Sequence, residues 1–143
     1  MLTVAHILND KLNKTTYTIS AQATVLEAIS LMADKGIGAL VVTEQEKVIG
    51  IVSERDYARK IALMERSSYD TQVAEIMTSK ALTVTSKNTI EQCLELMTER
   101  HLRHLPVVED DKLIGLVSIG DLVKGIIQQQ QQLIDQLQNY IAG

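Results

Sequence analysis

The chain of 143 residues contains no tryptophan, no phenylalanine and only four tyrosines. With so few aromatic rings its core must be aliphatic, and the stacking platforms that bind single-stranded nucleic acid are not expected. The formal net charge is −4, so no basic excess exists to release counterions from a phosphate backbone. These shortages argue against nucleic acid as a partner.

Long apolar runs and secretory features are also lacking. No run of about 18 apolar residues is present to span a bilayer, and the N-terminal segment has neither a basic n-region nor a continuous apolar segment. The single cysteine, Cys93, has no internal disulfide partner, which agrees with a reducing compartment. We therefore predict a cytoplasmic protein with no membrane partner, in which Cys93 packs in the core.

The sequence does contain an internal repeat. Gly-Ile-Val-Ser-Glu-Arg-Asp at 50–56 recurs as Gly-Leu-Val-Ser-Ile-Gly-Asp at 115–121, and this alignment continues without a gap over 17–60 and 82–125. Further upstream, VAHIL at 4–8 resembles VAEIM at 73–77, but at a slightly longer spacing. We therefore predict a first repeat at 1–65, a second repeat at 66–125 and a C-terminal helical extension at 126–143.

Both repeats predict the order strand, helix, strand, strand, helix. Thr24 and Thr89 begin helices with one apolar face, and Glu27 and Gln92 complete capping boxes three residues later. Paired apolar runs joined by polar turns predict hairpins of buried strands, at 39–42 with 48–52 and at 105–108 with 113–117. A repeat of about 60 residues leaves one sheet face uncovered, so we expect an α+β fold with the repeats packed sheet to sheet about a pseudo-twofold axis.

The repeated Ser-x-x-Asp pattern has two interpretations. Ser53 and Ser118 fall where a strand ends and a helix begins, so they are expected as N-caps, with Asp56 and Asp121 at N3. The same placement suits a phosphate at a helix N-terminus and a ribose diol on a short carboxylate. The residues alone leave helix capping and ligand binding open.

The element order, with hydrophobic-Pro-Val-Val before Gly-hydrophobic-Val-Ser-x-x-Asp, resembles the cystathionine β-synthase (CBS) domain, which occurs as tandem pairs called Bateman modules. The resemblance covers residues 1 to about 125. It implies clefts between the paired repeats that bind an adenosyl small molecule such as AMP, ADP, ATP, NAD or S-adenosylmethionine. Similarity to small stand-alone members implies a regulatory homodimer that acts on a separate, unidentified protein target.

Position by position, the resemblance assigns Asp56 and Asp121 to ribose and Ser53 and Ser118 to phosphate. The expected nucleotide-binding residues are Thr18, Ile19, Ile37, Gly38, Ala39, Ser53, Arg55 and Asp56 in one cleft, and Thr83, Val84, Arg103, His104, Leu105, Pro106, Ser118 and Asp121 in the other. The first repeat departs from the family pattern because Val41 stands where the second has Pro106. The position equivalent to Arg55 in the second repeat is Gly120, which has no charge, so the two sites should differ in ligand affinity.

Basic residues flank both sites. Arg55, Arg59 and Lys60 either meet an anionic ligand or form a solvated helix face, whereas Arg103 and His104 lie at a helix-to-strand junction that favours a phosphate contact.

Metal and enzyme functions are not expected. His101 and His104 have no further ligands at a recognisable metal-binding spacing. Neither motif offers a nucleophile with a histidine base, and no Walker-type glycine loop is present.

The segment after Gly125 has no counterpart in the first repeat. Its apolar residues follow a helical stripe that Gln130 interrupts, and its five consecutive glutamines are too few for a low-complexity linker. Such a helix either folds back on the repeats or packs against a second chain. We favour self-association.

Overall fold

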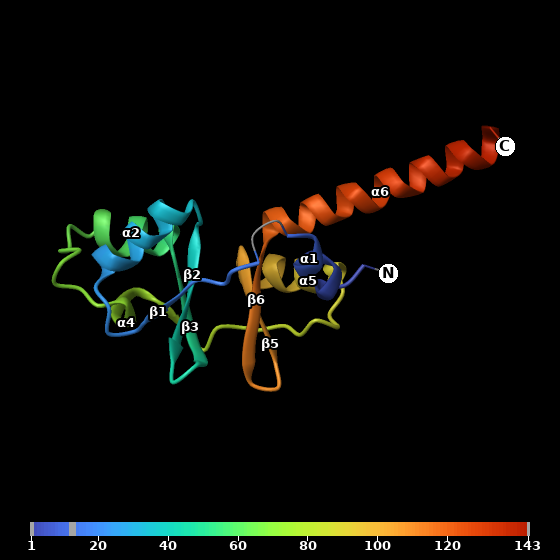
Figure 1. The fold of residues 1–143 in the computed structure, drawn as a ribbon. Helices are drawn as coiled ribbons and strands as arrows, with labels where there is room; N and C mark the ends of the chain where they lie inside the picture. The colour runs from blue at the N-terminus through green and yellow to red at the C-terminus, as the bar shows by residue number, and fades with distance from the viewer. Residues whose placement is uncertain (1, 12–13, 143) are drawn as a thin grey trace. The chain divides into compact units, whose positions relative to one another are not determined.

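The computed structural model describes residues 2–11 and 14–142 (Figure 1). It confirms the α+β class, with helices and strands that alternate as the repeat predicts. In chain order the elements are α1 (Val4–Asp10), β1 (Thr18–Ser20), α2 (Val25–Lys35), β2 (Ala39–Glu44), β3 (Lys47–Ser53), α3 (Glu54–Tyr57), the π-helical turn η1 (Ala58–Ala62), α4 (Val73–Ile76), β4 (Thr78–Ser79), α5 (Ile90–Arg100), β5 (His104–Glu109), β6 (Lys112–Ser118) and α6 (Ile119–Ala142).

The chain forms two compact units whose membership differs from the order of the repeats. The first-repeat unit comprises residues 15–82 and 110–114, and the second-repeat unit comprises residues 1–14, 83–109 and 115–143. The boundaries at 65 and 125 remain a prediction from the repeats of the sequence. In the folded chain, by contrast, each unit contains the short helical segment from the start of the other repeat, namely α4 in the first-repeat unit and α1 in the second-repeat unit.

These exchanged segments make equivalent hydrogen bonds in both units. Val73 N donates to Ala23 O at 2.8 Å, and Val4 N donates to Asn88 O at 2.9 Å. The two donors match in the upstream alignment of VAHIL with VAEIM, and the two acceptors match in the main alignment of the repeats. The upstream alignment therefore contains the donors of this hydrogen bond, and the main alignment of the repeats contains its acceptors.

Both predicted capping boxes are confirmed. Glu27 N donates to Thr24 Oγ1 at 3.1 Å while Thr24 N donates to Glu27 Oε2 at 3.2 Å. Gln92 N donates to Thr89 Oγ1 at 3.1 Å while Thr89 N donates to Gln92 Oε1 at 3.0 Å. These bonds satisfy donors that the first helical turn would otherwise leave unpaired, so they define where α2 and α5 begin.

The predicted hairpins are also confirmed. In the first-repeat unit the strand order is β1-β2-β3-β4, with β1 parallel to β2 and the other neighbours antiparallel. Strands β5 and β6 form a two-stranded sheet. The strand expected before α5 is reduced to one parallel bridge between Val84 and Val107, whereas its counterpart β1 pairs over three residues.

The core is aliphatic, as the lack of aromatic residues requires. In the first-repeat unit Met32, Leu40 and Ile76 are fully buried in one cluster. In the second-repeat unit Cys93 is fully buried, as is Ile90 on the same helix, which agrees with the predicted packing role of Cys93. No helix in the described part of the chain is long and apolar enough to cross a membrane.

Two equivalent glycines allow close contacts of different kinds. A Cβ on Gly50 would lie 2.7 Å from the backbone oxygen of Thr78, whereas a Cβ on Gly115 would lie 2.6 Å from the side-chain terminus of Leu8. The backbone of β4 is held by pairing to β3 and cannot move away from Gly50, but a leucine side chain can change rotamer.

We therefore predict that Gly50→Ala lowers the free energy of unfolding by about 1–3 kcal/mol, and that the matched control Gly115→Ala costs less. Urea unfolding followed by circular dichroism measures both values. Equal losses for the two variants would show that the strand contact at Gly50 is no tighter than the side-chain contact at Gly115.

Candidate functional site

The predicted residues of the first repeat meet at one end of its sheet. Strands β1 and β2 are parallel, so Thr18 and Ala39 lie toward the same sheet end, and antiparallel β3 returns to place Ser53 opposite Ala39. Glu54 N then donates to Gly38 O at 3.0 Å, which fixes the start of α3 beside the start of β2. The topology therefore brings the proposed base, phosphate and ribose contacts to one place.

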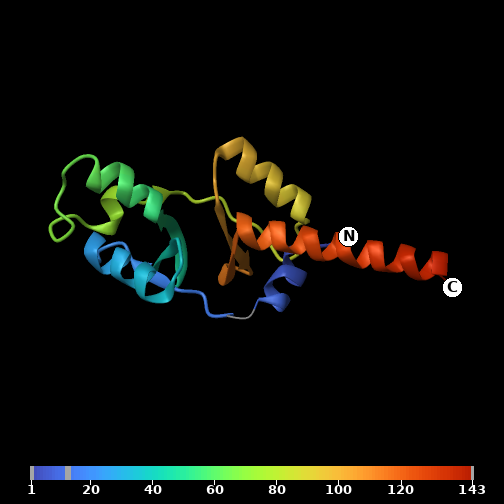
Figure 2. The ribbon, with the colours of Figure 1, turned by 90° about the horizontal axis from the view of Figure 1, so that it is seen from above.

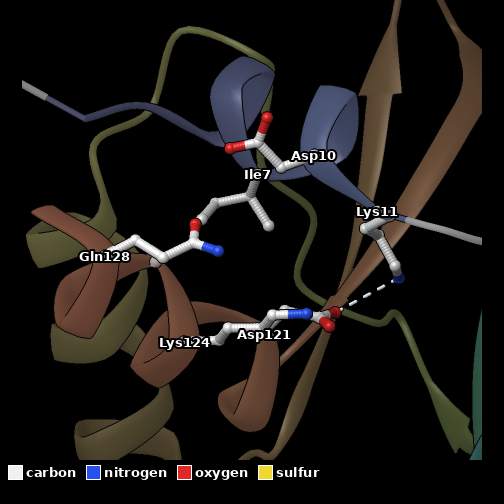
Figure 3. Close-up of a pocket in the computed structure, with 7 residues that line it drawn as sticks. Ile7, Asp10, Lys11, Asp121, Lys124 and Gln128 are labelled. Atoms are coloured by element: carbon white, nitrogen blue, oxygen red, sulfur yellow. Dashed lines mark ion pairs between the residues drawn. The ribbon is translucent and has the colours of Figure 1, made fainter.

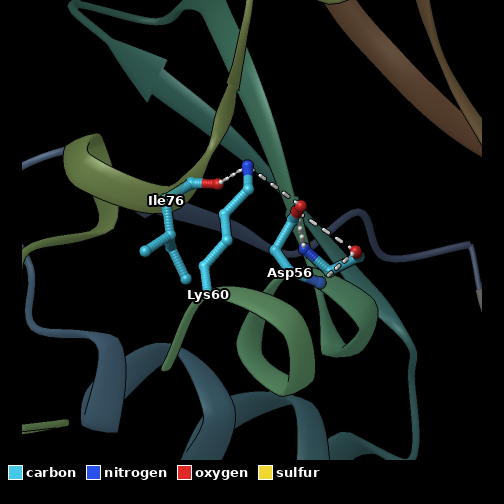
Figure 4. Close-up of polar contacts among 4 residues, drawn as sticks. Asp56, Lys60 and Ile76 are labelled. Carbon is cyan, nitrogen blue, oxygen red and sulfur yellow. Dashed lines mark hydrogen bonds and ion pairs between the residues drawn. The ribbon is translucent and has the colours of Figure 1, made fainter. Parts of the chain in front are cut away.

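The Ser-x-x-Asp pattern forms a complete capping box in this unit. Asp56 N donates to Ser53 Oγ at 3.2 Å, and Ser53 N donates to Asp56 Oδ2 at 2.9 Å. Lys60 Nζ lies 3.5 Å from Asp56 Oδ1 and also donates to Ile76 O at 2.8 Å (Figure 4). The carboxylate is therefore held by a helix start on one oxygen and partly neutralised by a lysine on the other.

The second-repeat unit contains the same capping box. Asp121 N donates to Ser118 Oγ at 3.1 Å and Ser118 N donates to Asp121 Oδ2 at 2.9 Å. Ile119 N donates to Arg103 O at 2.9 Å, which is the equivalent of the bond between Glu54 and Gly38. Helix capping by both heptapeptides, predicted from their position, is therefore confirmed.

A different lysine neutralises the second aspartate. Lys11 Nζ lies 3.2 Å from Asp121 Oδ2 (Figure 3). It also donates to Leu116 O at 2.9 Å. Lys60 follows Asp56 on the same helical segment, whereas Lys11 comes from the segment after α1. Within the described residues both contacts to Asp121 use Oδ2, so Oδ1 is the oxygen available to accept further hydrogen bonds.

Sequence reasoning missed Lys11. At the spacing that aligns VAHIL with VAEIM, Lys11 corresponds to Lys80. The ion pair of Asp56, however, is made by Lys60, so the two heptapeptides use lysines from different positions of the repeat. The run of basic residues near Asp56 drew attention to Lys60, but no local signal connects Lys11 to an aspartate in a distant part of the sequence.

The remaining predicted residues differ in accessibility. Arg55, Arg103, Thr18 and Thr83 are exposed, which leaves them able to meet a ligand. Partly buried positions are Ile19, Ile37, Gly38 and His104, and the fully buried ones are Ala39, Val84, Leu105 and Pro106. The buried residues can support the sites through their backbone groups and their packing.

A pocket of about 170 Å³ opens beside Asp121 in the second-repeat unit (Figure 3). Its lining shares only Asp121 with the predicted residues and otherwise consists of Ile7, Asp10, Lys11, Lys124, Gly125 and Gln128. The two carboxylates of the lining balance the charge of its two lysine ammonium groups. The pocket volume is also below the roughly 300 Å³ at which small-molecule sites begin. The pocket does not by itself accommodate a nucleotide.

The two histidines that could suggest a metal site lie on different secondary-structure elements. His101 ends α5 in the left-handed conformation (φ +55°), and His104 opens β5. Among the residues that the structure describes, no group of three or more His, Cys, Asp or Glu side chains is placed to hold a metal ion.

Burial changes the protonation of His104. Desolvation lowers the pKa of its imidazole, the nearby Asp121 carboxylate opposes this effect, and Lys11 and Arg103 add to it. Because the folded-state pKa is lowered, the unfolded chain binds this proton more readily than the folded chain. The stability contribution of neutral His104 is therefore lost as the pH falls below the ordinary histidine value of about 6.5.

We predict that His104→Gln reduces the loss of stability between about pH 6.5 and pH 5. Urea unfolding at several pH values measures the slope for the variant and the wild type. His101→Asn is the control, because it removes an exposed histidine and keeps a residue that tolerates the left-handed conformation. An unchanged slope in His104→Gln would contradict the role assigned to burial.

Comparisons with known proteins agree with this architecture. The model of the CBS domain matches residues 4–63 and 73–128. The solved structure of a protein with CBS domains from Burkholderia ambifaria is 53% identical, with a TM-score of 0.85 over 90% of this chain and 96% of that one. The mitochondrial CBSX3 of Arabidopsis thaliana is 42% identical over 84% of this chain, which spans 61% of the length of CBSX3.

Two more distant solved structures are a ligand complex and a hexamer. CBSX2, 24% identical with a TM-score of 0.74 over 90% of this chain and 98% of that one, was crystallised with AMP. A CBS-CP12 protein of bloom-forming cyanobacteria, 27% identical with a TM-score of 0.77 over 85% of this chain and 66% of that one, is hexameric. Because the relative CBSX3 is mitochondrial, the cytoplasmic location of this chain stays a prediction. On the evidence of both matched segments and the shared architecture, this chain belongs to the CBS domain family as a tandem pair.

Proposed function

We propose that the chain is a non-catalytic regulatory module that binds an adenosine-containing ligand and signals through a change of conformation or oligomeric state. The main support for this proposal is the aspartate that occurs at the equivalent position of both repeats, as Asp56 and Asp121. In each unit a carboxylate at N3 of a helix is held by a serine at a strand end and lies beside a lysine. The ligand class is supported by the family and by the AMP complex of CBSX2.

The local chemistry suits a nucleotide. A carboxylate accepts hydrogen bonds from both hydroxyls of a ribose. Within the described residues the Asp121 carboxylate makes its contacts through Oδ2, which supports a ribose contact at Oδ1. An anionic phosphate would be repelled by a bare carboxylate, but a lysine 3.2 Å from Asp121 offsets that charge. Exposed Arg103 adds a cation at the second site, and exposed Arg55 adds one at the first.

Signalling would follow from differential binding. A ligand that bridges strand ends and a helix start binds most tightly to the arrangement that places these groups best, and so shifts the population toward it. We propose that the signal is passed to a separate protein by a homodimer. The hexameric relative makes a larger assembly the alternative for the oligomer.

The second candidate function is a protein-interaction module that needs no ligand. It is favoured by the completeness of both capping boxes, because Ser53, Asp56, Ser118 and Asp121 already have structural roles in the protein itself. In that case the repeated motif would exist to begin two helices, and the exposed surfaces of the module would recruit its partner.

We predict that AMP, ADP, ATP, NAD or S-adenosylmethionine raises the melting temperature of the nucleotide-free protein by several degrees, and that Asp56→Ala/Asp121→Ala abolishes the shift. A ligand at about 100 times its dissociation constant adds about 2.7 kcal/mol per site, which is sufficient for such a shift. Differential scanning calorimetry with each ligand measures it.

A matched control separates capping from ligand binding. Glu27→Ala/Gln92→Ala also removes two N3 capping side chains, but from helices outside the proposed sites. Both double variants should melt earlier than the wild type, and only the control should keep the ligand-induced shift. No shift in the wild type with any of the five ligands would favour the interaction module, and equal shifts in all three proteins would contradict the aspartate assignment.

A further inference from the structure

The C-terminal half of α6 carries an apolar face that its own unit does not cover. The helix is anchored near its start, where Leu122 is buried and Gly125 allows a close approach to Ile7 and Ile90. Beyond that point it continues without a break to Ala142 and projects away from α1 and α5 (Figures 1 and 2). Residues 127–142 are exposed along nearly the whole length of this projection.

This face has a strict seven-residue period. Its apolar side chains are between 46% and 85% exposed at Ile127, Leu133, Ile134, Leu137, Tyr140 and Ile141. Val123, Gln130 and Leu137 form a central row of positions seven residues apart, and two flanking rows follow the same spacing at 126, 133 and 140 and at 127, 134 and 141. A repeat of seven residues keeps one face toward a supercoiled helical partner, so the period predicts a coiled coil.

A solitary helix of this composition would be poorly stable. The projecting segment 126–142 is about 25 Å long, and isolated helices of about 15 residues are marginal in water. Because its large apolar side chains face solvent, burial against a partner would stabilise it. An exposed stripe of this kind marks an interaction surface.

The charge pattern narrows the choice of partner. Asp135 is the only charged residue from 125 to 142, and it lies on the side of the helix opposite the stripe, where it accepts a hydrogen bond from Gln131 at 3.0 Å. An anionic membrane surface would favour Lys and Arg on the polar face, and none occur there. A foreign helix would be selected by charges that flank the stripe, and these are absent. Two copies of this helix bring no like charges together at the stripe, because Asp135 lies on the opposite side.

Gln130 favours a second copy in one orientation. Its side-chain amide both donates and accepts hydrogen bonds, so it can pair with an identical amide. In a parallel, in-register pair the two Gln130 side chains face each other. In a shifted pair, or in an antiparallel pair that is not centred on residue 130, each would face an apolar side chain. A single polar residue in a coiled-coil core selects register in this way at some cost in stability.

We propose that residues 123–141 form a parallel, two-stranded coiled coil with the same segment of a second copy of this chain, in which Gln130 faces Gln130. This inference deepens the homodimer of the proposed function, on which it rests, by naming its surface, and it requires no nucleotide.

Sedimentation equilibrium of the full chain tests the surface. Ile134→Glu/Leu137→Glu places charges on the stripe and should raise the dimer dissociation constant by roughly 100-fold, because two buried apolar side chains are lost. Gln132→Glu/Asn139→Glu adds the same charge on the opposite side of the helix and should leave the dimer intact. All these positions are exposed, so the fold of the unit should be unaffected.

The outcomes separate this inference from the proposed function. A dimer that survives Ile134→Glu/Leu137→Glu would overturn the coiled coil but leave a homodimer through another surface. A monomeric wild type would overturn both the coiled coil and the homodimer, whereas nucleotide binding is measured independently by calorimetry. A trimer or larger assembly that the stripe variant dissolves would overturn the two-stranded arrangement.

Disulfide cross-linking tests the orientation. Gln130→Cys and Leu137→Cys should each cross-link to the same position of the second copy, because an antiparallel pair brings at most one of them opposite itself. Asp135→Cys on the outer side is the control and should remain reduced, as should the buried Cys93 present in every variant. Failure of either core position to cross-link, or equal cross-linking at 135, would overturn the parallel register.

The core glutamine gives an independent readout. Gln130→Leu should tighten the dimer by roughly tenfold, since it replaces a polar core residue by an apolar one. A weaker dimer in this variant would contradict the placement of Gln130 in the core.

Discussion

Each compact unit depends on backbone hydrogen bonds made by a segment from outside its own repeat. Thr24 bridges Gln72 in one unit and Thr89 bridges Thr3 in the other. In the first-repeat unit Val25 N donates to Thr71 O at 2.8 Å, so the borrowed segment also satisfies a donor at the start of α2. In the folded chain each unit therefore draws the partner of one helix start from the other repeat.

The lysines beside the two aspartates make the two candidate sites unequal. Both begin with a serine and an aspartate in matching capping geometry, yet Lys60 reaches Asp56 from the following π-helical turn and Lys11 reaches Asp121 from a borrowed segment. One carboxylate therefore has its charge balanced locally, while the other depends on the position of the N-terminal segment. Two sites built on the same repeated motif consequently differ in the part of the chain that controls their electrostatics.

Much of this arrangement follows from local sequence signals. Apolar periodicity located the helices and hairpins. Thr24 and Ser118 marked helix starts because a hydroxyl at that position accepts a hydrogen bond from a backbone N–H that the first turn leaves unpaired. The exchange of segments could not be predicted, since it is a long-range pairing without a local pattern. Nor could β4 at Thr78–Ser79, which lacks apolar residues, or Lys11, whose partner lies in a distant heptapeptide.

Helix α6 is a single rigid element that connects a candidate ligand site with the C-terminal end of the described chain. It starts at the Ser118 cap beside Asp121 and runs for 24 residues, a length of about 36 Å. A rod held at one end acts as a lever arm, so a tilt of about 10° at the cap would move the far end by about 6 Å. A displacement too small to disturb the packing around Asp121 would therefore be mechanically amplified at Ile141.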